Sequence, residues 1–125
     1  MNRKLVGAFL VGIVLGGVAV LSVVASQERE LDPVKLAPHI YETALENEQV
    51  RVLKVTARPG QDPPVHSHPD RVLISVNECK ERLPADGDVE KVTYEAGDVS
   101  WEPAATHGEP STVVNECRFI EVELK

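Results

Sequence analysis

The sequence has few aromatic residues and few basic residues, and no segment shows the period of an amphipathic helix. Only 4% of its 125 residues are aromatic, so a core has to be built mostly from valine, leucine and isoleucine. The 13 lysines and arginines are outnumbered by 20 acidic residues, which gives a net charge of −7. This acidity argues against nucleic acid as a partner. The sequence also lacks a Ser/His/Asp or Cys/His nucleophile pattern and a glycine loop for phosphate.

The first 25 residues are the one long hydrophobic segment. Arg3 and Lys4 precede an uncharged run from Leu5 to Ala25, which as a helix would span about 30 Å, the thickness of a bilayer core. A secretory signal peptide has the same order, and Val23-Val24-Ala25 before Ser26 is an acceptable cleavage site. A signal peptide and an uncleaved membrane anchor therefore both stay open. Either one places the rest of the chain in the bacterial periplasm or cell exterior, membrane-anchored through residues 5–25 if uncleaved.

Residues 26–30 are polar and are interpreted as a short linker, and residues 31–125 are interpreted as one domain. Removing Arg3 and Lys4 from the 13 basic residues leaves 11 against 20 acidic residues, a net charge of −9 for the exported part. A domain of this size can fold alone, but with little stability to spare.

The two cysteines occur in nearly the same context, Val76-Asn-Glu-Cys79 and Val114-Asn-Glu-Cys117. Cysteines of an exported protein meet an oxidising environment, which favours a disulfide between them. Two free thiols are the alternative, because the sequence does not give the separation of the two residues in space.

After the linker, the pattern is that of short strands separated by turns. Asp32-Pro33 resembles a helix cap, but Pro38 allows one turn at most. About eight or nine short strands with turn signals roughly every 8–12 residues predict an all-β sandwich or barrel. In the last segment, residues 120–124, Ile120, Val122 and Leu124 alternate with Glu121 and Glu123. We expect the apolar residues to be buried and the glutamates to face water.

Two histidines stand one residue apart, just after a Pro/Gly-rich turn and before an apolar run. In an extended chain residues i and i+2 lie on the same face, so His66 and His68 can share one ligand. Imidazole is the commonest neutral metal ligand in proteins. His107 lies in a similar turn–strand setting, whereas His39, beside Pro38, is expected at the surface.

The spacing of Gly60, His66 and His68 resembles the first sequence motif of the cupin family. That motif continues with a glutamate and a second glycine. Here Val72 or Leu73 stands at the glutamate position, and Cys79 stands at the second glycine position.

The second cupin motif is matched in part at Gly97 and Pro103. Ala105 replaces a glycine, His107 arrives one residue early, and Ser111 stands where the motif has asparagine. The resemblance covers roughly residues 31–125 and is strongest to small bacterial single-domain cupins.

Resemblance to cupins implies a jelly-roll β-barrel with a divalent metal ion inside it. His66, His68 and His107 would be the metal ligands, and iron, manganese, zinc and nickel all stay open. A small-molecule ligand in the barrel cavity and a homodimer are the partners expected. The chain is then either a metal-dependent enzyme, dioxygenase-like or isomerase/hydrolase-like, or a non-catalytic binder of a small molecule or metal. A structural or partner-binding domain is the third alternative.

The absent motif glutamate changes the charge expected at the site. Three neutral imidazoles leave the charge of a divalent ion uncompensated, which favours an anionic substrate, a hydroxide or a nearby carboxylate. Asp70 lies two residues after His68, and Glu109 two residues after His107, so both are candidates for that carboxylate.

Overall fold

The computed structural model describes residues 31–85, 88–108 and 112–125, and Leu31–Lys125 form one compact unit. The apolar leader, the linker and Glu109 lie outside the described residues, so the predictions about them stay predictions. Within the described part of the chain, no helix is long and apolar enough to cross a membrane.

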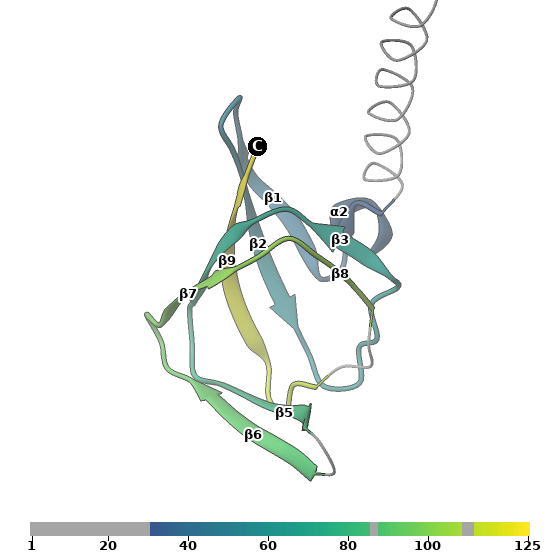
Figure 1. Cartoon of the computed structure of the whole chain (residues 1–125), viewed down its shortest axis with the longest axis vertical. Helices are drawn as coiled ribbons and strands as arrows, with labels where there is room; N and C mark the ends of the chain where they lie inside the picture. Colours follow the sequence, from purple (N-terminus) through teal and green to yellow (C-terminus); the bar gives the residue numbers. More distant parts are fainter. Residues whose placement is uncertain (1–30, 86–87, 109–111) are drawn as a thin grey trace, which may run out of the picture. The chain divides into compact units, whose positions relative to one another are not determined.

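One short helix and nine strands form the described unit (Figure 1). In chain order they are α2 (Pro33–Leu36), β1 (Tyr41–Glu46), β2 (Val50–Ala57), β3 (His66–His68), β4 (Arg71–Ser75), β5 (Cys79–Ala85), β6 (Asp88–Tyr94), β7 (Val99–Glu102), β8 (Ala105–His107) and β9 (Cys117–Leu124). The all-β prediction is confirmed. The predicted single helical turn is also present, because Asp32 caps α2 by accepting a hydrogen bond from the Val34 amide at 3.1 Å.

The strands form three antiparallel sheets. The largest has the order β1-β2-β9-β4-β7, while β3 pairs with β8 and β5 pairs with β6. The C-terminal strand β9 therefore lies at the centre of the large sheet, between β2 and β4. This placement carries residues from the end of the chain into the middle of the fold.

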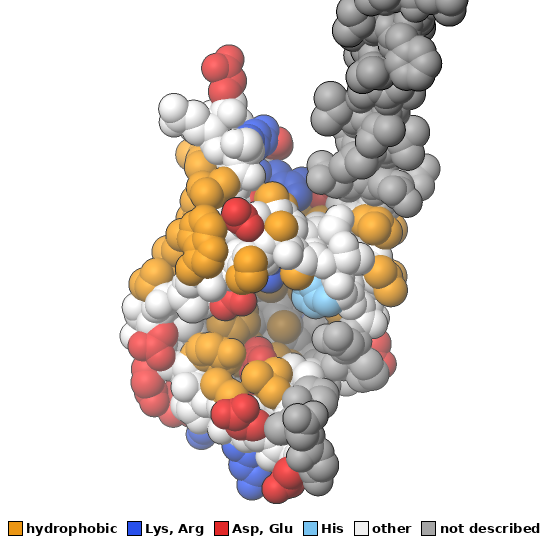
Figure 2. Space-filling model, viewed as in Figure 1, with side chains coloured by type: hydrophobic (Ala, Val, Ile, Leu, Met, Phe, Trp, Pro, Cys, Tyr) orange, Lys and Arg blue, Asp and Glu red, His pale blue; other side chains and the backbone are white. Residues whose placement is uncertain are grey.

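The pairing register gives the large sheet one apolar outer face. Residues aligned across all five strands form a continuous row: Leu45, Val52, Val122, Val72 and Trp101. The ends of this row are exposed, since Leu45 is 51% and Trp101 is 55% accessible. Figure 2 shows hydrophobic side chains at the surface of the molecule, and a hollow between the strands with a histidine at its edge.

The inner face of the same sheet is partly charged. Phe119, Glu121 and Glu123 of β9 are buried, and Glu123 is only 1% exposed. The prediction that Glu121 and Glu123 face water is therefore wrong. Alternation divides a strand into two faces, but it does not say which face lies inside when the interior carries charged groups. Here the interior has buried partners for those charges, while Ile120 and Val122 lie on the outer face.

A disulfide joins Cys79 to Cys117, as the sequence predicts, with a sequence separation of 38 residues. Cys79 begins β5 and Cys117 begins β9, so the bond ties the β5–β6 hairpin to the central strand of the large sheet. Both cysteines are fully buried within the main hydrophobic cluster, beside Phe119 and Leu53.

Candidate metal centre

The pairing of β3 with β8 brings the three predicted histidines together. His66 lies directly opposite His107, and His68 lies on the same face of β3, two residues further on. The ring centroids of His66 and His107 are 4.4 Å apart, and that of His68 is 5.0 Å from His66. One ligand atom from each of the three rings lies within 4.8 Å of the other two, so the group could hold a metal ion.

Gly108 allows this close pairing of the two short strands. A Cβ atom added at Gly108 would lie 2.5 Å from the Cα and 2.7 Å from the amide nitrogen of Val65. Backbone cannot move aside as a flexible side chain can, so only glycine fits beside His107 at this point of contact. The residue next to the third histidine is therefore part of what sets the geometry of the site.

Hydrogen bonds determine which ring nitrogen of His66 and of His68 is left to bind a metal ion. Nδ1 of His66 donates to the Pro64 carbonyl at 2.7 Å, and Nδ1 of His68 donates to Glu123 at 2.7 Å. Nε2 of each ring then carries the lone pair in the neutral form. In His66 that atom accepts a hydrogen bond from the Tyr41 hydroxyl at 3.0 Å.

The remaining Nε2 atoms show that the residues fit a metal ion. Nε2 of His68 and Nε2 of His107 are buried and have no hydrogen-bond partner among the described residues. Buried polar atoms without partners are rare and costly, and metal coordination would satisfy both. Burial lowers the pKa of His66 below its usual value. Burial and the neighbouring His66 and His68 lower the pKa of His107 to about 4. Burial therefore favours the neutral form of His66 and His107, which is the form that binds metals.

A network of charged groups contacts the Nδ1 side of the His68 ring. Glu123 accepts hydrogen bonds from His68 and, at 2.6 Å, from Arg51, which also contacts Asp32 at 3.0 Å. Burial alone raises the pKa of Glu123, but hydrogen bonds from His68 and Arg51 lower it overall. An ionised carboxylate behind a ligating imidazole holds the ring in place and makes it a stronger ligand.

The carboxylate missing from the first motif has a counterpart on another strand. Val72 belongs to the outer row, whereas Leu73 faces inward and lies directly opposite Glu121 of β9. An oxygen of Glu121 is 3.3 Å from Nδ1 of His68. Glu121 is 5% exposed, and burial raises its pKa. A carboxylate thus stands one strand away from the position where the motif would place it.

The carboxylates considered from the sequence are not the ones that reach the histidines. Asp70 is exposed and accepts a hydrogen bond from the Ala104 amide at 2.8 Å, which ties the β3–β4 turn to the β7–β8 connection. His39 is exposed, as predicted. Four residues near the histidines were not identified from the sequence: Tyr41, Arg71, Glu121 and Glu123. The period-two pattern of β9 was the one sequence signal for Glu121 and Glu123, and the prediction placed those two residues on the wrong face.

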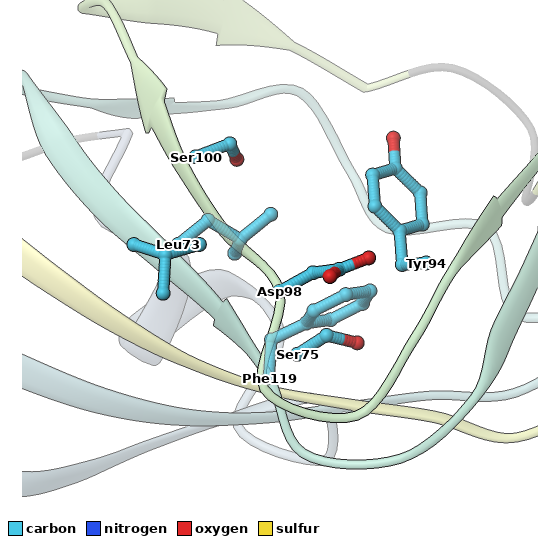
Figure 3. Close-up of a pocket in the computed structure, with 7 residues that line it drawn as sticks. Leu73, Ser75, Tyr94, Asp98, Ser100 and Phe119 are labelled. Carbon is cyan, nitrogen blue, oxygen red and sulfur yellow. The ribbon is translucent and has the colours of Figure 1, made fainter.

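A cavity lies on the inner face of the large sheet. Its volume is about 220 Å³, and it is lined by Leu73, Ser75, Tyr94, Asp98, Val99, Ser100 and Phe119 (Figure 3). Leu73 and Phe119 face the same way as their neighbours two residues along the strands, Arg71 and Glu121. The inner face of these two strands therefore carries a wall of the cavity and, two residues away, the buried charges of Arg71 and Glu121.

Comparison with known structures defines the fold. A cupin domain from Bordetella pertussis Tohama I aligns at 22% identity with a TM-score of 0.52, covering 69% of this chain and 92% of that one. A cupin superfamily protein from Desulfitobacterium hafniense DCB-2 aligns at 12% identity and a TM-score of 0.49, covering 68% and 75%. A protein with a double-stranded β-helix domain from Klebsiella pneumoniae aligns at 25% identity and a TM-score of 0.48, also covering 68% and 75%.

No protein-family model matches the sequence, and no curated protein is significantly similar to it. The alignment with the Bordetella domain shows that the chain has the cupin fold, a jelly-roll β-barrel, as the motif resemblance implied. At this level of identity the similarity establishes the fold and not a reaction, because one fold carries many functions.

Proposed function

We propose that this chain is a metal-binding cupin that holds one divalent ion through Nε2 of His66, His68 and His107. The observation that carries the proposal is the pair of buried, unpartnered Nε2 atoms on His68 and His107. To bind the ion, His66 exchanges its hydrogen bond from Tyr41 for a bond to the metal. Iron, manganese, zinc and nickel all bind imidazole, so the ligand set alone leaves the identity of the metal open.

The interior charges support binding of a cation and of an anionic ligand together. Glu123 is paired with Arg51, while Arg71 lies 3.5 Å from Glu121. With Asp32, which also contacts Arg51, the two arginines and three carboxylates sum to −1 when all are ionised, so a divalent ion would leave the interior at +1. An anionic small molecule would restore neutrality.

An enzyme acting on a small molecule is the first form of this proposal. A divalent ion with open coordination positions supplies Lewis acidity, or oxygen chemistry in the case of iron or manganese. The chain's own part would be to favour the neutral form of His66 and His107 through burial and to fix the His68 ring through Glu123. The reaction class is then dioxygenase-like or isomerase/hydrolase-like.

A non-catalytic binder of metal or small molecule is the second form, and Leu73 favours it. This leucine occupies a position of the cupin glutamate and turns its apolar side chain toward the cavity. Export to the periplasm or cell exterior is proposed for both forms. The buried Cys79–Cys117 disulfide supports it, because such bonds persist in oxidising compartments.

Metal content of the purified protein tests the proposal. The full-length chain is kept in mild detergent, loaded with each metal in turn, dialysed and analysed by elemental mass spectrometry. We expect one ion per chain in the wild type and in the exposed control His39→Ala, and a large loss in His68→Ala and His107→Ala. If the wild type holds no tightly bound ion after either reducing or oxidising preparation, the metal-binding proposal is contradicted. Oxygen uptake with candidate thiols and diketones then separates the enzyme from the binder.

A further inference from the structure

Arg71 is a buried cation that its neighbours satisfy only in part. It is 8% exposed, and its Nε and Nη1 atoms are buried without a hydrogen-bond partner in the described part of the chain. Its nearest carboxylate, Glu121, lies 3.5 Å from Nε, a long ion pair rather than a hydrogen bond. A guanidinium has five donors and is always charged, so leaving buried donors unpaired is costly.

The position of Arg71 links the metal centre to the cavity. It lies opposite Glu123 in the β4–β9 pairing, and Glu123 holds the ring of His68. Two residues further along β4, on the same face, Leu73 lines the cavity. The positive charge of Arg71 also contributes, after burial, to the lowered pKa values of His66 and His107. Arg71 therefore lies opposite the carboxylate that holds His68, and two residues along β4 from a residue that lines the cavity.

The cavity itself suits a small organic molecule. Figure 3 shows the rings of Tyr94 and Phe119 and the side chain of Leu73 around the space, together with the hydroxyl groups of Ser75 and Ser100 and the carboxylate of Asp98. Its volume of about 220 Å³ accommodates a compact molecule and not a polymer. Apolar walls with a few polar groups are typical of small-molecule sites.

We propose that Arg71 binds the carboxylate of a small organic acid whose apolar part occupies the cavity lined by Leu73, Tyr94 and Phe119. The planar fork of the guanidinium matches a carboxylate in two parallel hydrogen bonds. A singly charged planar group also suits an interior that already contains Glu121 and Glu123 better than a doubly charged phosphate does. The inference rests on the proposed function, because it places the carboxylate beside the three-histidine centre and names the class of ligand.

Benzoate and benzamide test this inference, because they share a shape and differ in charge. Each is titrated calorimetrically into the full-length chain, both metal-free and zinc-loaded, at neutral pH and low salt. We expect the metal-free wild type to bind benzoate at least about tenfold more tightly than benzamide, the gain of a charge-assisted hydrogen bond. Arg71→Gln should abolish this preference, Arg71→Lys should retain part of it, and the exposed control Arg58→Gln should keep it in full.

A second variant keeps the inference testable if Arg71→Gln does not fold. Leu73→Trp fills the cavity without altering Arg71, and it should weaken both probes while circular dichroism shows an intact fold. Equal binding of the two probes by the wild type overturns the inference and indicates that Arg71 serves Glu121 alone. Preference retained by a folded Arg71→Gln also overturns it. Metal content, measured on the same samples, separates this failure from failure of the metal proposal.

Discussion

Nδ1 of His68 lies 2.7 Å from Oε1 of Glu123, although 55 residues separate them in the sequence. The contact exists because β9 lies at the centre of the large sheet and turns its glutamates into the barrel. It fixes the ring so that Nε2, and not Nδ1, faces His66 and His107. The candidate metal centre therefore depends on the end of the chain as much as on the histidine motif.

Glu123→Gln should weaken metal binding by roughly 10–100-fold, the usual effect of losing a carboxylate behind a ligating histidine. An amide can present either oxygen or nitrogen to His68, so it neither fixes the tautomer nor strengthens the ligand. Affinity is measured by competition with a chromophoric chelator. Glu116→Gln is the control, since Glu116 forms an exposed ion pair with Arg58. Equal affinities in the two variants would show that Glu123 has no part in the site.

Tyr41→Phe should tighten metal binding by up to about fivefold. The Tyr41 hydroxyl donates to the Nε2 atom of His66 that the metal needs, and breaking a neutral hydrogen bond costs about 1 kcal/mol. Phenylalanine keeps the ring in contact with both histidines and removes the competing donor. The same chelator competition measures the change, and a weaker affinity would instead make the hydroxyl a supporting group of the bound state.

Loss of the disulfide should lower the free energy of unfolding by about 4 kcal/mol, from the chain-entropy model for a loop of this length. The double variant Cys79→Ala with Cys117→Ala tests this by urea denaturation, with the reduced wild type for comparison. The bond joins β5 to β9, two strands that share few other contacts across the core. An unchanged denaturation midpoint would show that packing around the two positions suffices.

Acidification should destabilise the metal-free protein between about pH 7 and pH 4. The pKa of His107 is about 4 in the folded state against an ordinary 6.5, so the unfolded chain takes up the proton first. Stability contributed by neutral His107 is present above pH 6.5 and is lost as the pH falls toward 4. The pKa of Glu121 is raised in the folded state, so protonation of Glu121 favours the folded state as the pH falls and offsets part of this loss.

His107→Asn removes the histidine contribution and should reduce the difference in unfolding free energy between pH 7 and pH 5. The reduction should be on the order of 1 kcal/mol, after allowance for solvent screening of a half-buried group. Denaturation with urea at the two pH values measures it. An identical pH dependence in wild type and variant would assign the effect to other groups.

The sequence was sufficient to predict the fold and the grouping of the three histidines. Short alternating strands and two half-motifs indicated a jelly roll, and the i, i+2 spacing placed His66 and His68 on one face. The direct pairing of His66 with His107 also depends on Gly108, whose contact with Val65 becomes visible only in the folded chain.

The supporting charges could not be predicted in the same way. A strand of alternating apolar and acidic residues normally buries its apolar side, and that rule assigned Glu121 to water. In this barrel the outer row is apolar and the interior is charged, because Arg51, Arg71 and His68 offer partners from other strands. Such a reversal depends on tertiary pairing across distant segments, and local periodicity carries no information about it.

X-ray absorption spectroscopy of the zinc-loaded, full-length chain tests the central claim most directly. We predict a first shell that contains three nitrogen ligands at about 2.0–2.1 Å, with the outer-shell scattering of three imidazole rings. His39→Ala should leave the spectrum unchanged, while His107→Ala should lose one imidazole. A first shell made of oxygen alone, or one with sulfur from the cysteines, would contradict a metal centre built from His66, His68 and His107.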